Sequence, residues 1–290
     1  MRISVIVPVY NEEETVAQIL ESLSQVPLDL EVVVVDDGST DRSWKILQEL
    51  RQKEPFKTYL YVQHSRNQGK GACLQTGLRL ISGDLVVVQD ADMEYDPQNL
   101  PTLVRMWEEA GDPRVAVYGV RDLSAQKFTT RWGNRFMTKV ANILYGCHIH
   151  DLHTCYKVIP GMLARALQMK SRRFAIDPEI TACIVQAGYT ILEAPISYAP
   201  RKAKKLSPWK DGWPALAILL RYRFGKRSQA VASFTKDRGT LPSLVKSGRT
   251  QSDRSIETMS GRAFIGVLTF VEQDDMPGFE PNLTDESIIL

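Results

Sequence analysis

The sequence predicts an α/β protein in which a mostly parallel central sheet is flanked by helices. Short runs rich in β-branched residues alternate along the chain with segments of helical period, an order typical of parallel strands joined by crossover helices. Polar residues follow directly after three of these runs, where open α/β sheets bind their ligands. The predicted strands cover residues 3–9, 31–35, 59–62, 85–88 and 115–118.

The first predicted helix follows the first strand. Asn11 is a suitable N-cap, and Glu14, three residues later, completes a capping box. Apolar residues then recur with helical spacing over residues 16–23, which gives this helix one face to bury. Further helices are expected to begin near Asp41, Lys70, Pro97, Thr130, Asp177 and Trp209.

Composition excludes several classes of protein. The chain has 290 residues, of which 43% are hydrophobic and 24% charged, as in ordinary globular proteins. The 36 Lys and Arg residues nearly balance the 34 Asp and Glu residues, so no overall charge favours nucleic-acid binding. The four cysteines show no CxxC spacing, no signal peptide is evident, and the apolar stretches 214–220 and 263–271 are too short to span a membrane. We expect a cytosolic protein that crosses no membrane, although part of it can lie on one.

The chain is expected to divide near residue 227. Residues 1–227 carry the α/β pattern, whereas the tail 228–290 is rich in small polar residues and ends in acidic ones. This composition predicts a disordered or loosely packed tail, to which residues 263–271 could add one strand or short helix.

Three polar clusters follow the predicted strands and should meet at one edge of the sheet. The first begins at Pro8, the second at Asp36 and the third at Asp90. The third cluster contains an Asp-x-Asp pair, Asp90 and Asp92, directly after a Val-rich strand. Carboxylate oxygens suit Mg²⁺ or Mn²⁺, which usually complete their coordination with water and substrate phosphates. The clusters therefore indicate a metal site for a phosphorylated substrate.

Longer motifs extend this interpretation. They are PVYNE at residues 8–12, VVDDGSTD at 34–41, NQGKGA at 67–72, DADMEYDP at 90–97, TCYK at 154–157, DPE at 177–179 and WKDG at 209–212. In this order they resemble the family 2 glycosyltransferases of the GT-A fold, particularly those similar to dolichol-phosphate or polyprenol-phosphate mannosyl- and glucosyltransferases. The resemblance covers roughly residues 1–227 and implies a GT-A type nucleotide-diphospho-sugar transferase fold.

The resemblance implies a role for each matching residue. The nucleotide would be bound by Pro8, Tyr10, Glu12, Asp37, Lys70 and Asp90. The divalent metal, Mg²⁺ or Mn²⁺, would be held by Asp90, Asp92 and Glu94, the last standing where many relatives have Gln. Catalysis would depend on Asp92, Arg121, Arg131 and Asp151, and the acceptor phosphate would be bound by Arg131, Arg201 and Lys205.

The chemistry agrees with this assignment. Breaking the bond between a sugar and a nucleoside diphosphate builds negative charge on the leaving phosphate, which a metal and nearby cations stabilise. A polyprenyl phosphate acceptor is already anionic and needs no general base. In-line attack would then invert the anomeric centre of the transferred hexose.

A basic cluster indicates how such an enzyme could reach a lipid acceptor. Lys and Arg residues between positions 201 and 227 surround Trp209 and Trp213, with apolar Leu216, Leu219 and Leu220 nearby. This basic amphipathic pattern could lie along an anionic membrane surface. We therefore expect a peripheral protein at the cytoplasmic face of a membrane, although a helix packed in the core would show similar apolar positions.

The sequence is also compatible with other functions. The same fold could transfer a sugar to a glycan or small-molecule hydroxyl, with Asp151 as the base. A nucleotidyltransferase would share the fold and the metal site but release pyrophosphate, and a non-catalytic nucleotide-sugar sensor would only bind the donor. The three histidines His148, His150 and His153 lack the spacing of a zinc site. His153 stands where relatives commonly carry Glu, a difference that would mark a subgroup with another acceptor.

Overall fold

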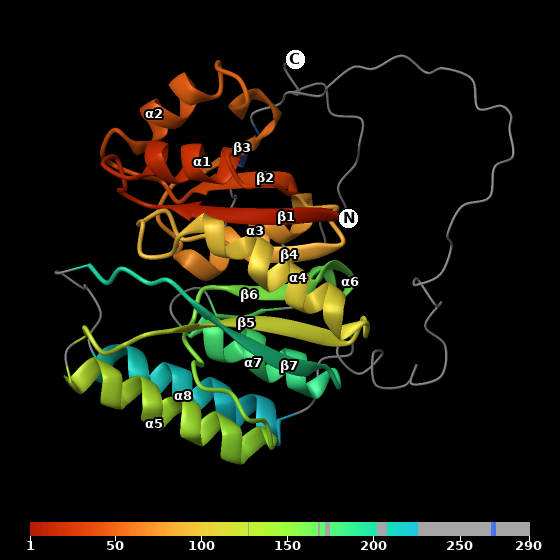
Figure 1. The fold of residues 1–290 in the computed structure, drawn as a ribbon. Coiled ribbons are helices and arrows are strands. Elements are labelled where there is room, and N and C mark those ends of the chain that lie inside the picture. Colours follow the sequence, from red (N-terminus) through yellow and green to blue (C-terminus); the bar gives the residue numbers. More distant parts are fainter. Residues whose placement is uncertain (127, 168, 172–174, 202–207, 226–267, 271–290) are drawn as a thin grey trace, which may run out of the picture.

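The computed structural model confirms the predicted fold class. It describes residues 1–126, 128–167, 169–171, 175–201, 208–225 and 268–270, with the side chains of 208–212 and 268–270 left aside. The described strands form one sheet of eight strands in the order β7-β5-β6-β4-β1-β2-β3-β8 (Figure 1). They are β1 (Arg2–Val9), β2 (Asp29–Asp36), β3 (Leu60–His64), β4 (Leu85–Val88), β5 (Val115–Arg121), β6 (Lys157–Pro160), β7 (Thr190–Ile196) and β8 (Leu268–Phe270).

The strand order creates a switch point between β1 and β4. β1 and β4 pair with each other in parallel. On the β1 side the sheet continues with β2 and β3, whereas on the β4 side it continues with β6, β5 and β7. Connections that diverge in this way open a crevice at the carboxyl ends of the strands. β6 runs antiparallel to both β4 and β5, so the residues before it, rather than after it, reach the same edge.

Helices cover both faces of the sheet. One face buries β-branched residues such as Val5 and Val34 against α1, α2 and α4, and the other buries Ile6 and Val35 against α3, α6 and α7. The helices are α1 (Val16–Ser24), α2 (Ser43–Leu50), α3 (Lys70–Leu80), α4 (Leu100–Ala110), α5 (Phe128–Tyr145), α6 (Gly161–Ala166), α7 (Ile176–Gln186) and α8 (Pro208–Phe224). Short 3-10 helices cover Phe56–Thr58 and Pro97–Asn99.

Helices α5 and α8 form a separate layer at the β7 end of the molecule, where they lie side by side (Figure 1). A small apolar cluster that includes Met137, Ala141, Leu152 and Leu219 joins them to each other and to the turn before β6. No helix in the described part of the chain is both long enough and apolar enough to pass through a bilayer.

The first helix begins later than predicted. Asn11 adopts a left-handed backbone conformation with φ of 54° and its side chain accepts a hydrogen bond from the Thr40 amide, so it does not cap a helix. Residues 12–15 form a turn, and α1 starts only at Val16. The expected capping box is therefore wrong, because Asn11 is used to tie the β1 loop to the β2 loop.

Strands β6 and β7 and helix α6 have no counterpart in the predicted elements. In the tail, β8 falls within the predicted segment 263–271 and pairs in parallel with β3. The other residues of the proposed tail lie outside the described residues.

Candidate active site

The candidate site lies at the carboxyl edge of the sheet, where the loops after β1, β2 and β4 meet. The loop after β1 is fixed to the β2 loop: the Asn11 amide donates to Ser39 Oγ at 3.0 Å and the Glu12 amide donates to Ser43 Oγ at 2.8 Å. Glu12 thereby faces the crevice opposite the loop after β4. The polar clusters predicted from the sequence are brought together as expected.

Asp90 is the first acidic residue after β4 and is paired with Lys70. The Lys70 Nζ lies 2.6 Å from Asp90 Oδ1 and also approaches Cys155 Sγ at 3.6 Å. Burial raises the pKa of Asp90, but the Lys70 ammonium outweighs it and holds the pKa below its ordinary value. Lys70, the first residue of α3, thus brings a positive charge to the crevice.

Asp92 lies in a more strongly negative environment. Burial, followed by the neighbouring carboxylates of Asp90 and Glu94, raises the pKa of Asp92 to about 7. About a quarter of its side chain remains exposed, and the same fraction of Asp90 is exposed. The two carboxylates of the Asp-x-Asp pair therefore both reach the crevice.

Glu94, proposed as a third metal ligand, has both carboxylate oxygens occupied. Oε2 accepts a hydrogen bond from the Tyr198 hydroxyl at 2.7 Å, and Oε1 accepts one from the Arg201 amide at 2.9 Å. The Glu94 carbonyl also accepts from the Ala199 amide. These contacts fasten residues 197–201, the segment after β7, across the Asp-x-Asp loop and favour a positioning role for Glu94.

Arg201 places its guanidinium between the two sides of the crevice. Nη2 lies 2.5 Å from Glu12 Oε2, while Nε donates to the Asp92 carbonyl at 3.1 Å and lies 3.7 Å from Asp92 Oδ2. The side chain is more than one-third exposed. Arg201 is therefore at the site, as predicted, but in contact with acidic side chains.

Arg121 and Asp151 form a buried two-point ion pair. Arg121 Nε and Nη2 lie 2.6 and 2.8 Å from the two Asp151 oxygens, and Asn134 Nδ2 donates to Oδ1 at 3.0 Å. The guanidinium also lies 5.2 Å from the centre of the Tyr198 ring. Burial raises the pKa of Asp151, but the Arg121 hydrogen bonds and charge hold it below its usual value. A carboxylate held in this way is a weak base, which disfavours the predicted base role of Asp151.

Asp37 is occupied by the loop that precedes α3. Its Oδ1 accepts from the Gln68 amide and contacts His64 Nδ1 at 2.8 Å, and its Oδ2 accepts from the Gly69 amide at 2.7 Å. Asp37 therefore holds the loop before α3 rather than presenting a free carboxylate. Nothing in the sequence near His64 indicated this contact.

Among the described residues, Asp37, His64 and Cys73 also form a group in which one potential metal-ligand atom of each residue lies within 4.8 Å of the others. All three are buried. His64 Nε2 lies 2.9 Å from Thr76 Oγ1, so both ring nitrogens already have partners, and burial raises the pKa of the Cys73 thiol. This group is a hydrogen-bonded support for the loop.

The remaining predicted site residues are Pro8, Tyr10, Arg131 and Lys205. Pro8 is part of β1 and Tyr10 is exposed at the rim of the site. Arg131 is on α5, where its guanidinium lies 5.8 Å from the centre of the Phe128 ring. Lys205 lies outside the described residues.

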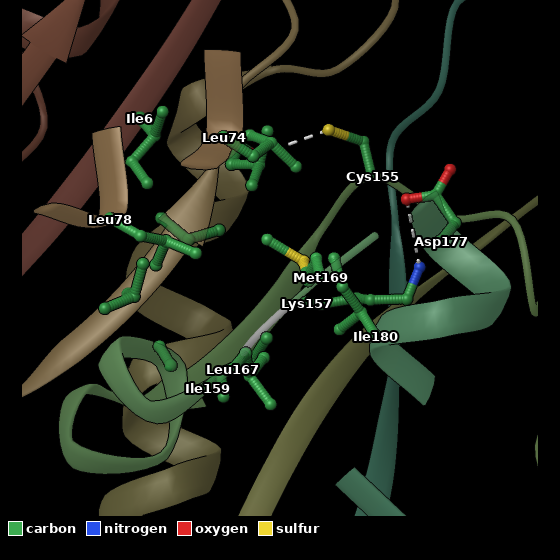
Figure 2. Close-up of a pocket in the computed structure, with 14 residues that line it drawn as sticks. Ile6, Leu74, Leu78, Cys155, Lys157, Ile159, Leu167, Met169, Asp177 and Ile180 are labelled. Atoms are coloured by element: carbon green, nitrogen blue, oxygen red, sulfur yellow. Dashed lines mark hydrogen bonds and ion pairs between the residues drawn. The ribbon is translucent and has the colours of Figure 1, made fainter. Parts of the chain in front are cut away.

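A small cavity lies beneath the site, on the α3 and α7 face of the sheet. Apolar side chains, including Leu74 and Ile180, line most of it, and Cys155, Lys157 and Asp177 form its polar end (Figure 2). Lys157 Nζ lies 3.5 Å from Asp177 Oδ1. Burial lowers the pKa of Lys157.

The chain belongs to glycosyl transferase family 2, whose sequence model matches residues 4–167. An undecaprenyl-phosphate 4-deoxy-4-formamido-L-arabinose transferase of Proteus mirabilis is 35% identical over 147 residues, which are 49% of this chain and 43% of that protein. A dolichol-phosphate mannosyltransferase of Pyrococcus furiosus is 35% identical over 114 residues, 39% of this chain and 32% of that protein. The matched part thus spans less than half the length of these two relatives.

Solved structures confirm the GT-A fold. The glucosyl-3-phosphoglycerate synthase of Mycobacterium tuberculosis, solved with Mn²⁺, uridine-diphosphate-glucose and phosphoglyceric acid, superposes with a TM-score of 0.61. The alignment covers 78% of this chain and 81% of that one, at 20% sequence identity. The same protein has also been solved with Mg²⁺ and uridine-diphosphate.

Proposed function

We propose that the protein transfers a hexose from a nucleoside diphosphate sugar, of the GDP-mannose or UDP-glucose type, to a polyprenyl phosphate. The observation that carries this proposal is the pair Asp90 and Asp92 at the carboxyl edge of the sheet, with Lys70 2.6 Å from Asp90. Two relatives are named for undecaprenyl-phosphate and dolichol-phosphate acceptors, which supports the same acceptor class here.

The residues present fit a divalent cation. Asp90 and Asp92 offer partly exposed carboxylates, and the pKa of Asp92 is raised by burial and then by the neighbouring carboxylates of Asp90 and Glu94, whose negative charge a bound cation would offset. Mg²⁺ or Mn²⁺ suits such oxygen ligands and, when bound, would stabilise negative charge on the donor diphosphate. Glu94 does not belong to this proposed set of metal ligands, because both its carboxylate oxygens already accept hydrogen bonds.

The cationic side chains have two tasks in the proposed reaction. Lys70 and Arg201, which lie next to Asp90 and Asp92, would contact the diphosphate as negative charge develops on the leaving group. Arg121 holds Asp151 and the Tyr198 ring, which keeps the segment after β7 in place. Arg131, on α5, would bind the acceptor phosphate in a two-point contact.

A phosphate acceptor agrees better with the geometry than a hydroxyl acceptor does. The attacking oxygen of a lipid phosphate is already ionised, so the reaction requires no base. The candidate base Asp151 is buried and bound to Arg121 and Asn134 through both its oxygens. In-line attack would invert the anomeric centre.

The layer of α5 and α8 supports docking on an anionic membrane surface. On α5, the exposed side chains include Phe128, Trp132, Phe136 and Ile143, and on α8 they include Trp213, Leu220 and Phe224. Arg135, Lys139, Arg221 and Arg223 are also exposed on these helices. Exposed aromatic and basic side chains on neighbouring helices are typical of helices that lie in a bilayer interface. Leu219, predicted to contribute, is instead buried, and Leu216 is half-buried.

The experiment follows product formation. Purified protein is incubated with Mn²⁺ or Mg²⁺, a short polyprenyl phosphate and either GDP-mannose or UDP-glucose, and released nucleoside diphosphate and labelled glycolipid are measured. We expect lipid-dependent product that is lost in Asp92→Asn and Arg131→Ala and retained in Asp122→Asn, an exposed control. Hydrolysis of the donor without glycolipid would point to a hydroxyl acceptor, pyrophosphate release to a nucleotidyltransferase, and binding without turnover to a sensor.

A further inference from the structure

His153 lies at the edge of the candidate site with one ring nitrogen already bonded. It belongs to the turn between α5 and β6, two residues before Cys155, whose thiol approaches Lys70. Its Nδ1 lies 2.8 Å from Asn134 Oδ1. Within the described part of the chain, its other nitrogen, Nε2, has no hydrogen-bond partner.

The partners of Asn134 determine which ring nitrogen carries the proton. Asp151 is ionised and can only accept, so the Asn134 group that faces it at 3.0 Å must be the amide NH₂. The amide oxygen therefore faces His153, and an oxygen without a proton requires Nδ1 to be the donor. A neutral imidazole with its proton on Nδ1 leaves a lone pair on Nε2.

The surroundings keep this ring neutral. Burial lowers the pKa of His153 to about 4, and the charged groups around it are Asp177 of α7, Lys157 of β6, Arg121 of β5 and Asp151 of its own turn. His153 as a whole residue is nevertheless partly exposed, and Nε2 is not one of the enclosed side-chain atoms that lack a partner in the described part of the chain. Nε2 is therefore an acceptor that a ligand group can reach.

We propose that Nε2 of His153 accepts a hydrogen bond from a hydroxyl group of the substrate, and that His153 contributes in this way to substrate choice. This inference rests on the proposed function, which supplies hydroxyl groups on the donor sugar. Asn134 and Asp151 are positioning residues that fix the tautomer, as a carboxylate fixes the tautomer of a catalytic histidine. The resemblance assigns no such role, since relatives commonly carry Glu at this position.

Two substitutions separate the nitrogens. His153→Asn keeps a side-chain NH₂ near the position of Nδ1 and removes Nε2, whereas His153→Gln places an amide near the position of Nε2. We expect His153→Asn to weaken binding of UDP-glucose or GDP-mannose about fivefold to tenfold with no change for UDP or GDP, and His153→Gln to recover part of the loss. His148→Asn, at an exposed position, is the matched control and should bind like the wild type.

The proposed acceptor, a polyprenyl phosphate, carries no alcohol hydroxyl, so the hydroxyl that His153 contacts belongs to the donor sugar. Equal affinities of His153→Asn and wild type for the sugar nucleotides would therefore overturn the inference. Thermal melts establish that each variant is folded.

The tautomer is tested without any activity. The chain has four histidines, so ¹⁵N-edited imidazole spectra are tractable, with His153→Gln identifying the signal. We expect a neutral ring with the proton on Nδ1 between pH 6 and 8, and a change of Nε2 shift when the sugar nucleotide is added. A proton on Nε2 would overturn the inference and leave the proposed function intact, whereas wild-type protein that binds neither sugar nucleotide would refute the proposed function itself.

Discussion

At the residue scale, the intact Arg121–Asp151 pair is expected to be needed for the stability of the folded protein. Both side chains are buried, so removing one charge leaves the other without a partner in a poorly solvated place. We predict that Asp151→Asn lowers the free energy of unfolding by about 3 kcal/mol, measured by urea denaturation. Asp122→Asn, one residue beyond Arg121 and exposed, should leave it unchanged. A stable Asp151→Asn protein that lacks only turnover would instead restore the base role.

His153 makes stability depend on pH. Its pKa is about 4 in the folded protein and near 6.5 when unfolded, so between these values the unfolded chain binds the additional proton. The contribution of His153 to the free energy of unfolding is therefore fully present above pH 6.5. It falls as the pH drops toward 4, by at most about 3 kcal/mol. We predict that His153→Gln flattens the slope of unfolding free energy over this range. An equal slope in wild type and variant would contradict the low pKa.

At the element scale, the segment 197–201 is held to the Asp-x-Asp loop through Glu94. Glu94→Ala removes the acceptors for the Tyr198 hydroxyl and the Arg201 amide, whereas the backbone carbonyl at position 94 still accepts from the Ala199 amide. We predict faster hydrogen exchange at the Arg201 amide, on the order of tenfold for the loss of one hydrogen bond. Exchange in β1, which this segment does not contact through Glu94, is the internal control. Unchanged exchange at Arg201 would mean that the segment is held by other contacts.

Helix α5 offers a second test at this scale. Trp132 and Phe136 are exposed and stack with ring centres 5.8 Å apart. If they enter a bilayer interface, replacing both by Ser should weaken binding to anionic vesicles by at least about tenfold in a sedimentation assay. Met162→Ser, which removes another exposed apolar side chain on α6, is the control. An equal effect of the two changes would remove α5 from the proposed docking surface.

The elements also show what the sequence could predict. β1, β2 and β4 were found because both faces of a parallel strand are buried and favour β-branched runs. β6 and β7 were missed because β6 contains Lys157 and ends at Pro160, while β7 is mostly only partly buried and contains Pro195. Strand ends located Asp90, Asp92 and Glu12, but the Glu94–Tyr198 contact joins residues 104 positions apart. No local sequence pattern predicts a contact between residues so far apart. Only the structure shows that the carboxylates of Glu94, Asp37 and Asp151 already have hydrogen-bond partners.

At the scale of the whole molecule, the candidate-site residues in the described part of the chain all lie at or before Arg201. β8 lies at the opposite edge of the sheet from β5 and β7, next to β3. We therefore predict that a chain ending at residue 227 binds nucleoside diphosphate with unchanged affinity in calorimetry. Loss of nucleotide binding in this shorter chain, with a cooperative thermal melt retained, would show that later residues contribute to the site.

Arg201 has a consequence for the effect of salt. Because its guanidinium already lies between Glu12 and Asp92, the crevice neutralises part of its own negative charge before any substrate arrives. A donor that draws this guanidinium toward its phosphates exchanges one internal counter-ion contact for another. Few solution ions are taken up or released in such an exchange, so the affinity for the nucleotide should depend only weakly on ionic strength.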